Sequence, residues 1–168
     1  MKQNITLKYE EISTKELVEQ VRTIFQILRN LIFIKSNDVM IYKNEKCFNL
    51  VMGFFFNCID PEITKNVLEI VSILCKHIVI SNLEKEMQTS FIERVLDFLN
   101  SDNYDEYESV LNCLHNLMLS QENEPYIENM LPKFLDSLVK QLICSSLEII
   151  ESCLEILCYL SDLKMSTR

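Results

Sequence analysis

A nine-residue apolar pattern recurs four times along the chain, and each occurrence ends in a leucine. The four segments are TIFQILRNL (23–31), NVLEIVSIL (66–74), SVLNCLHNL (109–117) and SCLEILCYL (152–160). Their closing leucines are spaced 43 residues apart at every step: Leu31, Leu74, Leu117 and Leu160. A period of this length is typical of α-solenoids, whose small helical units stack because no unit can bury its apolar stripe alone. The recurrence therefore predicts a row of similar helical units.

Other landmarks recur with the same period and divide each unit into three helices. A phenylalanine opens each predicted second helix: Phe48, Phe91 and Phe134. A residue suited to helix N-capping precedes each complete nonamer helix, which is the predicted third helix: Asp60, Asn103 and Ser146. Pro61 suits the first turn of such a helix, where its missing N–H costs nothing. A short first helix is expected before each second helix, and STKE at 13–16 resembles a capping box that would start a lone third helix.

These boundaries predict a single domain over residues 1–168. It would consist of a partial first repeat and three complete ones, at 13–36, 37–80, 81–123 and 124–164. The predicted fold is all-α, an armadillo/HEAT-like right-handed superhelix of about three and a half three-helix repeats. One glycine and three prolines in 168 residues agree with a nearly all-helical chain. Because solenoid ends need polar caps, we expect the apolar last helix or the incomplete first repeat to be covered by another chain.

Composition and motifs argue against several classes of function. A net charge of −9 disfavours broad binding to nucleic-acid phosphates. No apolar run reaches the length of a membrane span, and the first residues lack the apolar core of a signal peptide. Seven cysteines then fit a reducing compartment, where they act as small apolar side chains. We expect no metal site, no cofactor, no small-molecule substrate and no enzymatic activity, since no ligand cluster or nucleophile–base motif is present.

Three segments resemble one particular family. LRNLIFIKSN (28–37) is similar to a signature of the armadillo subunits of SWI/SNF-type chromatin remodellers, most closely the RSC/PBAF subunits of the AT-rich-interaction-domain group. LHNLMLSQEN (114–123) echoes it, and residues 145–163 resemble the last armadillo helix of those subunits. The resemblance implies a nuclear, non-enzymatic scaffold that binds other protein subunits. The family's DNA-binding domain is missing from this sequence, so sequence-specific DNA binding is not expected.

The third helices are expected to line a concave, partner-binding groove. Its candidate residues are Arg22, Arg29, Asn30, Lys65, Lys76, His115, Asn116, Glu151, Glu155 and Tyr159. The first half of this set is mostly basic and the second mostly acidic, which would orient a partner segment; a solvated face with incidental charge is the alternative. Armadillo repeats often place an asparagine here to hold an extended peptide. Asn30 and Asn116 match that pattern, whereas Ile73 and Tyr159 depart from it. A free-standing adaptor, such as a transport receptor or a chaperone cofactor that binds an extended peptide, is therefore the alternative function.

Overall fold

The computed structural model describes the backbone of residues 3–144 and 146–166 and the side chains of residues 14–143 and 146–162. This part of the chain is all-helical and contains no strand. Eight α-helices occur in it: α1 (Gln3–Ile32), α2 (Asn37–Lys43), α3 (Glu45–Asn57), α4 (Pro61–Leu74), α5 (Lys85–Leu99), α6 (Tyr104–Met118), α7 (Glu124–Cys144) and α8 (Leu147–Ser166). Two 3₁₀ turns join them, η1 (Ile80–Asn82) and η2 (Gln121–Asn123).

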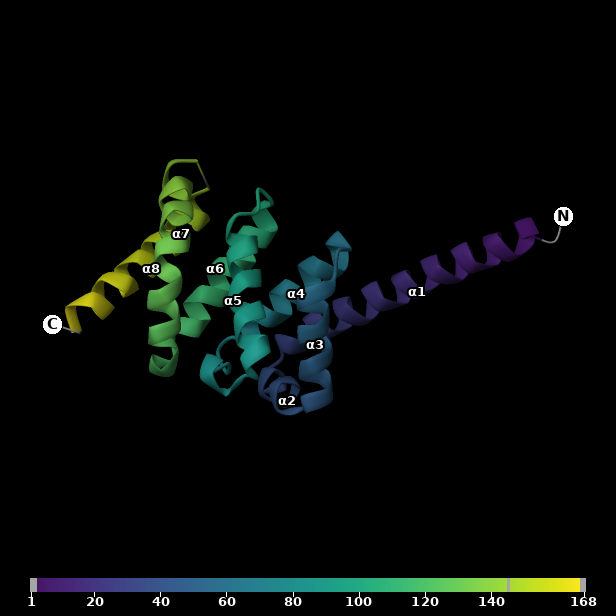
Figure 1. Cartoon of the computed structure of the whole chain (residues 1–168), viewed down its shortest axis with the longest axis horizontal. Coiled ribbons are helices and arrows are strands. Elements are labelled where there is room, and N and C mark those ends of the chain that lie inside the picture. Colours follow the sequence, from purple (N-terminus) through teal and green to yellow (C-terminus); the bar gives the residue numbers. More distant parts are fainter. Residues whose placement is uncertain (1–2, 145, 167–168) are drawn as a thin grey trace.

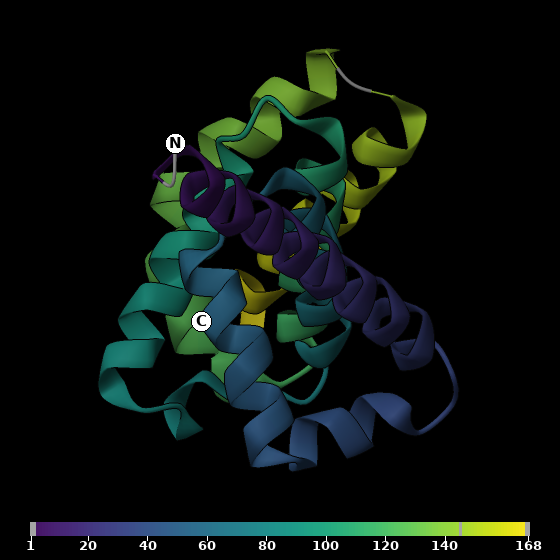
Figure 2. The same ribbon diagram turned by 90° about the vertical axis from the view of Figure 1, so that its right-hand side faces the viewer.

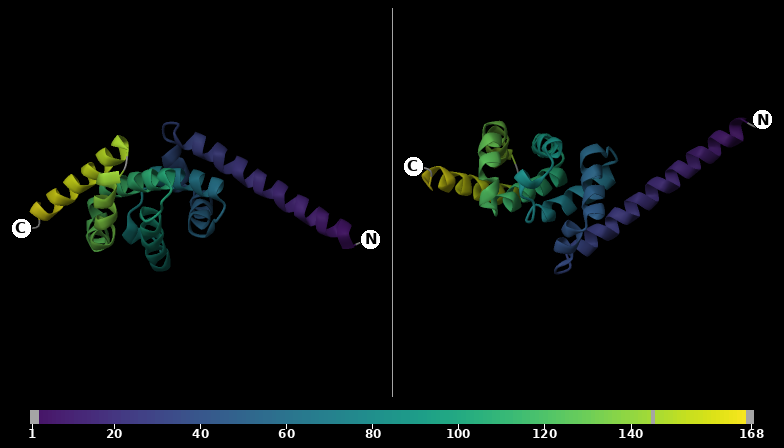
Figure 3. Two further views of the ribbon diagram at one scale, coloured as in Figure 1. Left: turned by 90° about the horizontal axis from the view of Figure 1, so that it is seen from above. Right: turned by 60° about the horizontal axis from the view of Figure 1, so that its bottom comes forward.

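The helices are arranged in two rows (Figure 1). Helices α1, α4, α6 and α8 contact one another in that order, and they are the helices that carry the recurring nonamer. Helices α3, α5 and α7 form the second row, and each packs against the nonamer helix that follows it in the chain. Figure 3 shows this second row on one side of the first. The arrangement is compatible with an α-helical solenoid.

The first turns of the three complete third helices, α4, α6 and α8, are capped as the sequence predicts. The Asp60 carboxylate accepts a hydrogen bond from the Ile63 N–H at 3.1 Å, and the Asn103 side chain accepts one from the Asp105 N–H at 3.1 Å. Pro61 is the first residue of α4. The Ser146 hydroxyl oxygen lies 3.5 Å from the Ile149 nitrogen at the start of α8. Each cap satisfies a backbone N–H that the helix itself leaves unpaired.

Two predicted elements differ from the structure. Helix α1 begins at Gln3 and passes through Ser13, so the predicted helix start at 13 is wrong. No glycine or proline lies in this stretch to stop the helix, and its N-terminal part extends away from the stack (Figure 1). The expected short first helix forms as a separate helix only as α2; the next repeat has the single turn η1 in its place. In the last repeat the predicted first and second helices form one continuous helix, α7. A buried asparagine side chain satisfies the backbone of the η1 region instead.

That asparagine is Asn123, whose side chain is completely buried. It accepts a hydrogen bond from the Ile80 N–H at 2.8 Å and donates to the carbonyls of Ile78 and Leu117 at 2.9 and 3.0 Å. Asn37 is the equivalent residue two periods earlier, and it donates to the Leu31 carbonyl at 2.8 Å. The asparagine that closes each of the similar segments 28–37 and 114–123 therefore binds the carbonyl six residues before it. In the later segment it also ties the turn after α6 to the turn after α4.

Three of the four recurring leucines are in the core. Leu74 and Leu117 are fully buried and Leu160 is 5% exposed, whereas Leu31 is 42% exposed. The exposure of Leu31 lies in the incomplete first repeat, one of the two ends that the sequence leads us to expect another chain to cover. Helix α1 packs mainly against α2 and α4 and has no preceding nonamer helix among the described residues. Its core-facing residues are instead Phe25 and Ile32.

Candidate functional site

A hollow of about 530 Å³ lies on the surface of the nonamer helices α1, α4 and α6. Its lining residues are Arg29, Phe33, Lys65, Glu69, Ser72, Ile73, Lys76, Asp105, Glu108, Ser109, Asn112 and Asn116. Four of the ten predicted groove residues are in this set: Arg29, Lys65, Lys76 and Asn116. The other six are not: Arg22, Asn30, His115, Glu151, Glu155 and Tyr159. The structure thus brings Arg29, Lys65, Lys76 and Asn116 together at one hollow. It leaves outside the hollow the other predicted residues of α1 and α6 and all those of α8.

The basic residues of one nonamer helix pair with acidic residues of the next. Arg29 of α1 pairs with Glu69 of α4, and Lys65 of α4 pairs with Asp105 of α6. Each pair joins residues 40 positions apart, close to one repeat. The Asp105 carboxylate raises the pKa of Lys65 through their hydrogen bond. These pairs link neighbouring nonamer helices along the lining of the hollow.

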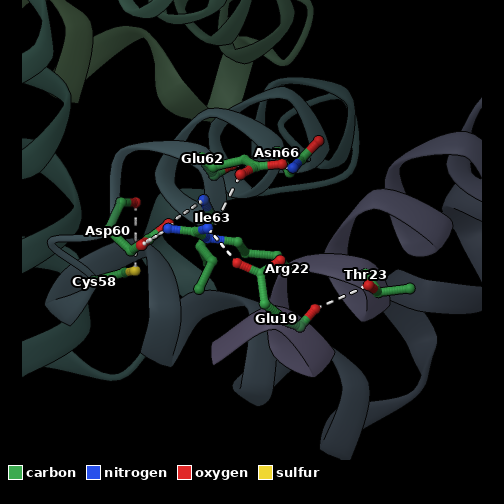
Figure 4. Close-up of polar contacts among 8 residues, drawn as sticks. All are labelled: Glu19, Arg22, Thr23, Cys58, Asp60, Glu62, Ile63 and Asn66. Atoms are coloured by element: carbon green, nitrogen blue, oxygen red, sulfur yellow. Dashed lines mark hydrogen bonds and ion pairs between the residues drawn. The ribbon is translucent and has the colours of Figure 1, made fainter. Parts of the chain in front are cut away.

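Arg22 makes the largest set of polar contacts at the α1–α4 junction (Figure 4). Its guanidinium donates two hydrogen bonds to the Asp60 carboxylate, at 2.7 and 3.2 Å, and a third to Glu19 at 2.7 Å. Its Nε also lies 3.5 Å from the Glu62 carboxylate. The hydrogen bond from Arg22 lowers the pKa of Asp60 and raises that of Arg22. Asp60 therefore both caps α4 and fixes α1 against it.

The charge of the hollow is balanced. Three of its lining side chains are cationic and three are anionic: Arg29, Lys65, Lys76, Glu69, Asp105 and Glu108. The expected basic half is thus largely neutralised by acidic residues that the structure places beside it. Within the described residues, Lys76 makes no ion pair within 4.0 Å, and it also lines a neighbouring hollow of about 290 Å³ with Phe33 and Asp38. Lys76 is the groove cation most available to a partner.

The proposed asparagine row has a different role in the structure. The Asn116 amide donates to the Ser72 carbonyl of α4 at 2.8 Å. Tyr159, at the equivalent position one period later, donates its hydroxyl to the Met118 carbonyl at 2.5 Å. Asn30 is exposed. Asn116 and Tyr159 therefore each bridge a nonamer helix to the last residues of the preceding one, and the Asn116 amide is already engaged.

The remaining predicted residues lie toward α8. His115 and Glu155 face each other across α6 and α8 with 3.9 Å between the Nδ1 and Oε2 atoms, and both are largely exposed. Glu151 is exposed on α8. Besides the acidic partners of Arg29 and Lys65, sequence reasoning missed a further polar contact near the hollow. His77 Nε2 lies 2.9 Å from Asp38 Oδ2, and this hydrogen bond lowers the pKa of Asp38. Nothing in the one-dimensional pattern distinguishes these two residues, because they are 39 positions apart.

The cysteines pack as apolar side chains where they lie in the core. Cys75, Cys113 and Cys153 are buried, and burial raises the pKa of Cys75 and of Cys153. In the portion of the chain whose side chains are described, no three histidine, cysteine or acidic residues come together as metal ligands would. No helix in the described region is both long enough and apolar enough to span a membrane. A scan against protein families and a search of curated proteins each found no match to this chain.

Proposed function

We propose that this chain is a non-enzymatic scaffold that binds other protein chains through an armadillo/HEAT-like stack. The finer architecture in this proposal is a right-handed superhelix of about three and a half three-helix repeats. Its support is the 43-residue period together with the order of contacts from α1 to α4, α6 and α8. At the three positions of Val67, Ile70 and Leu74, the equivalent residues of α6 and α8 are buried as well, as expected for a repeated unit.

The observation that carries the function is the apolar surface exposed at both ends of the stack. Side chains of α1 are exposed at one end: Leu17, Ile24, Ile27 and Leu31. Side chains of α7 and α8 are exposed at the other: Leu135, Val139, Ile143, Leu147 and Leu154. Clustered apolar surface of this kind marks sites of protein association. A scaffold that joins partners at its ends and along its hollow accounts for both surfaces.

The particular assembly we propose is a SWI/SNF-type chromatin-remodelling complex in the nucleus, with this chain as one of its non-catalytic subunits. Its support is the resemblance of residues 28–37, 114–123 and 145–163 to the armadillo subunits of such complexes. Contacts with other subunits, rather than with DNA, membranes or small molecules, are expected to carry the function.

The alternative is a free-standing adaptor that binds one extended peptide in the hollow. The mixed charge and volume of the hollow favour it, because an extended peptide presents both polar backbone and side chains. The engaged Asn116 amide counts against it, since a peptide backbone would have to displace the bond to Ser72.

Affinity purification of the tagged full-length chain from native extract, followed by size-exclusion chromatography and mass spectrometry, separates the two proposals. Co-elution with an ATPase and other remodeller subunits at high mass supports the scaffold. A small complex with one partner, weakened by Lys76→Glu in the hollow and unaffected by Leu154→Asp at the end of the stack, supports the adaptor. A monomer without protein partners would refute both.

A further inference from the structure

One face of α1 exposes apolar residues at positions that are buried in every later nonamer helix. Ile24, Ile27 and Leu31 are 55%, 54% and 42% exposed. Their equivalents are at most 5% exposed: Val67, Ile70, Leu74, Val110, Cys113, Leu117, Cys153, Ile156 and Leu160. With Leu17, which is 59% exposed, these residues form the α1 stripe. Figure 2 shows α1 crossing the front of this end of the molecule.

The interior of the stack shows what covers such a stripe. Helix α4 packs against the preceding nonamer helix, α1, and against α3, which precedes it in its own repeat. At each junction the covering nonamer helix turns an apolar face toward the nonamer helix that follows it in the chain, and we call this its forward face. One position identifies that face. Phe25, Leu68 and Leu111 are each 1% exposed, but the equivalent Leu154 is 47% exposed. Only α8 lacks a following nonamer helix among the described residues, so this position faces forward.

The covering helix also brings a cation to an acidic residue of the covered helix. Arg22 reaches Glu62 at the α1–α4 junction, and the equivalent Lys65 reaches Asp105 at the α4–α6 junction. Glu62 and Asp105 are equivalent positions, and Glu19 occupies the same position on α1. Glu19 is 67% exposed, and its ion-pair partner among the described residues is Arg22 of the same helix. A helix that covers the α1 stripe would therefore meet the Glu19 carboxylate. At these two internal junctions the carboxylate at this position pairs with a cation of the covering helix.

A second copy of this chain does not supply that cation. Its α8 would offer the exposed Leu154, but Glu151 occupies the position of Arg22 and Lys65 and would face Glu19. Residues 147–162 contain four carboxylates and no lysine or arginine: Glu148, Glu151, Glu155 and Asp162. Like charges at such a junction oppose association.

One internal junction also has a carboxylate at this position, and there a tyrosine hydroxyl contacts the acidic residue of the covered helix. Glu108 occupies the position at the α6–α8 junction, where the Tyr104 hydroxyl lies 2.7 Å from Ser146 Oγ and 3.5 Å from a Glu148 oxygen. Leu147 is the equivalent of Tyr104 in α8, so a junction between two copies would lack this hydroxyl.

We propose, building on the protein-binding scaffold above, that the α1 stripe docks a helix of a different protein that places a lysine or arginine opposite Glu19. Internal junctions define the spacing of that helix. A base is followed by apolar residues three, six and ten positions later, as in Arg22-Phe25-Leu28-Ile32 and Lys65-Leu68-Val71-Cys75. The docking segment is thus a basic amphipathic helix of the form [K/R]-x₂-Φ-x₂-Φ-x₃-Φ, where Φ is apolar.

A synthetic peptide tests this recognition directly. The probe copies residues 14–34 and carries Leu17→Gln, Ile24→Gln, Ile27→Gln and Leu31→Gln, so that the four residues of the stripe itself are polar and the forward face stays apolar. Fluorescence anisotropy of the labelled peptide, titrated with the full-length chain, should show saturable binding. Ile27→Asp in the chain should weaken binding at least about tenfold, because it places a charge in the apolar contact. Glu19→Lys should weaken it about three- to tenfold, as expected for reversing one exposed ion pair.

Two controls make the result specific. A peptide that also carries Arg22→Glu should bind the Glu19→Lys chain better than the unmodified chain, because the charge pair is restored with reversed sign. Leu154→Asp, at an equally exposed apolar residue of the opposite end, should leave peptide affinity within about twofold. Circular dichroism of each variant should match the parent, since all the substituted side chains are exposed.

Absence of binding, or equal binding by the parent, Ile27→Asp and Glu19→Lys chains, overturns the proposal. So does sedimentation velocity that shows head-to-tail association of the chain alone, abolished by Ile27→Asp, because the occupant is then a second copy. The scaffold function is judged separately by co-purification. If the chain co-purifies with a large assembly but does not bind the peptide, the scaffold function stands and only the basic helix is excluded as its ligand.

Discussion

Asn123 should be the most sensitive polar residue of the fold. Its side chain is 0% exposed and makes three hydrogen bonds of 2.8–3.0 Å, to the Ile80 N–H and to two carbonyls. Replacing it by alanine leaves these three backbone groups without their partner and opens a cavity of about one amide group. These groups belong to two different repeats, so the substitution weakens both the turn after α6 and its contact with the turn after α4.

The expected cost follows from the number of groups left unpaired. An unsatisfied buried donor or acceptor costs about 1–3 kcal/mol, and water entering the cavity recovers part of this. We therefore expect Asn123→Ala to lower the free energy of unfolding by about 3–5 kcal/mol. That is a large share of the roughly 5–15 kcal/mol typical of a whole domain. Asn37→Ala, at the equivalent but half-exposed position with one such bond, should cost only about 1 kcal/mol.

Urea denaturation followed by circular dichroism at 222 nm measures both variants. The two curves also show whether the stack unfolds as a unit, because a solenoid whose repeats uncouple loses its single transition. A difference between Asn123→Ala and Asn37→Ala of less than about 0.5 kcal/mol would refute the reasoning, since it would mean that the buried bonds add nothing beyond the local one. Asn123→Asp keeps the acceptor for Ile80 but points a carboxylate at two carbonyls, so it should be more stable at acidic than at neutral pH.

Three further expectations concern single side chains. Leu74→Ala should cost about 3 kcal/mol and the equivalent Leu31→Ala less than about 1 kcal/mol in the same assay, because only the first is buried; equal losses would contradict the described end of the stack. Gly53→Ala should stabilise the chain by up to about 1 kcal/mol, measured by thermal unfolding, since a Cβ there meets nothing within 4 Å and α3 gains helix propensity. Arg22 lowers the pKa of Asp60, so the pair stabilises the fold above the unfolded pKa of about 3.9 and this contribution is lost as the pH falls through the lower folded value. The stability difference between the parent and Asp60→Asn, which keeps the cap, should therefore shrink below about pH 4 in pH-dependent urea titrations; a pH-independent difference would rule out the ion pair as its source.

The candidate site was predictable in part. The third helices and their caps follow from local patterns, so Arg29, Lys65, Lys76 and Asn116 could be assigned to one surface before the structure was known. Their partners could not. Glu69 and Asp105 face Arg29 and Lys65 because neighbouring helices pack with a particular offset, and helical periodicity within one helix carries no information on that offset. The sequence therefore predicted a groove with one basic and one acidic half, whereas the structure pairs most of the groove cations with acidic residues of the next helix.

What the sequence by itself determined is the repeated unit: the 43-residue period, the α-helical class, and the caps at Asp60 and Asn103. These three features depend on interactions within a few turns of one helix. Such interactions can be predicted from residue type and spacing alone. Only the tertiary structure decided that Leu74 is buried while Leu31 is exposed, and that Asn123 joins two repeats. The physical reason is that burial and long-range hydrogen bonds depend on which helix lies alongside, and an identical segment meets different neighbours in the middle of a stack and at its end.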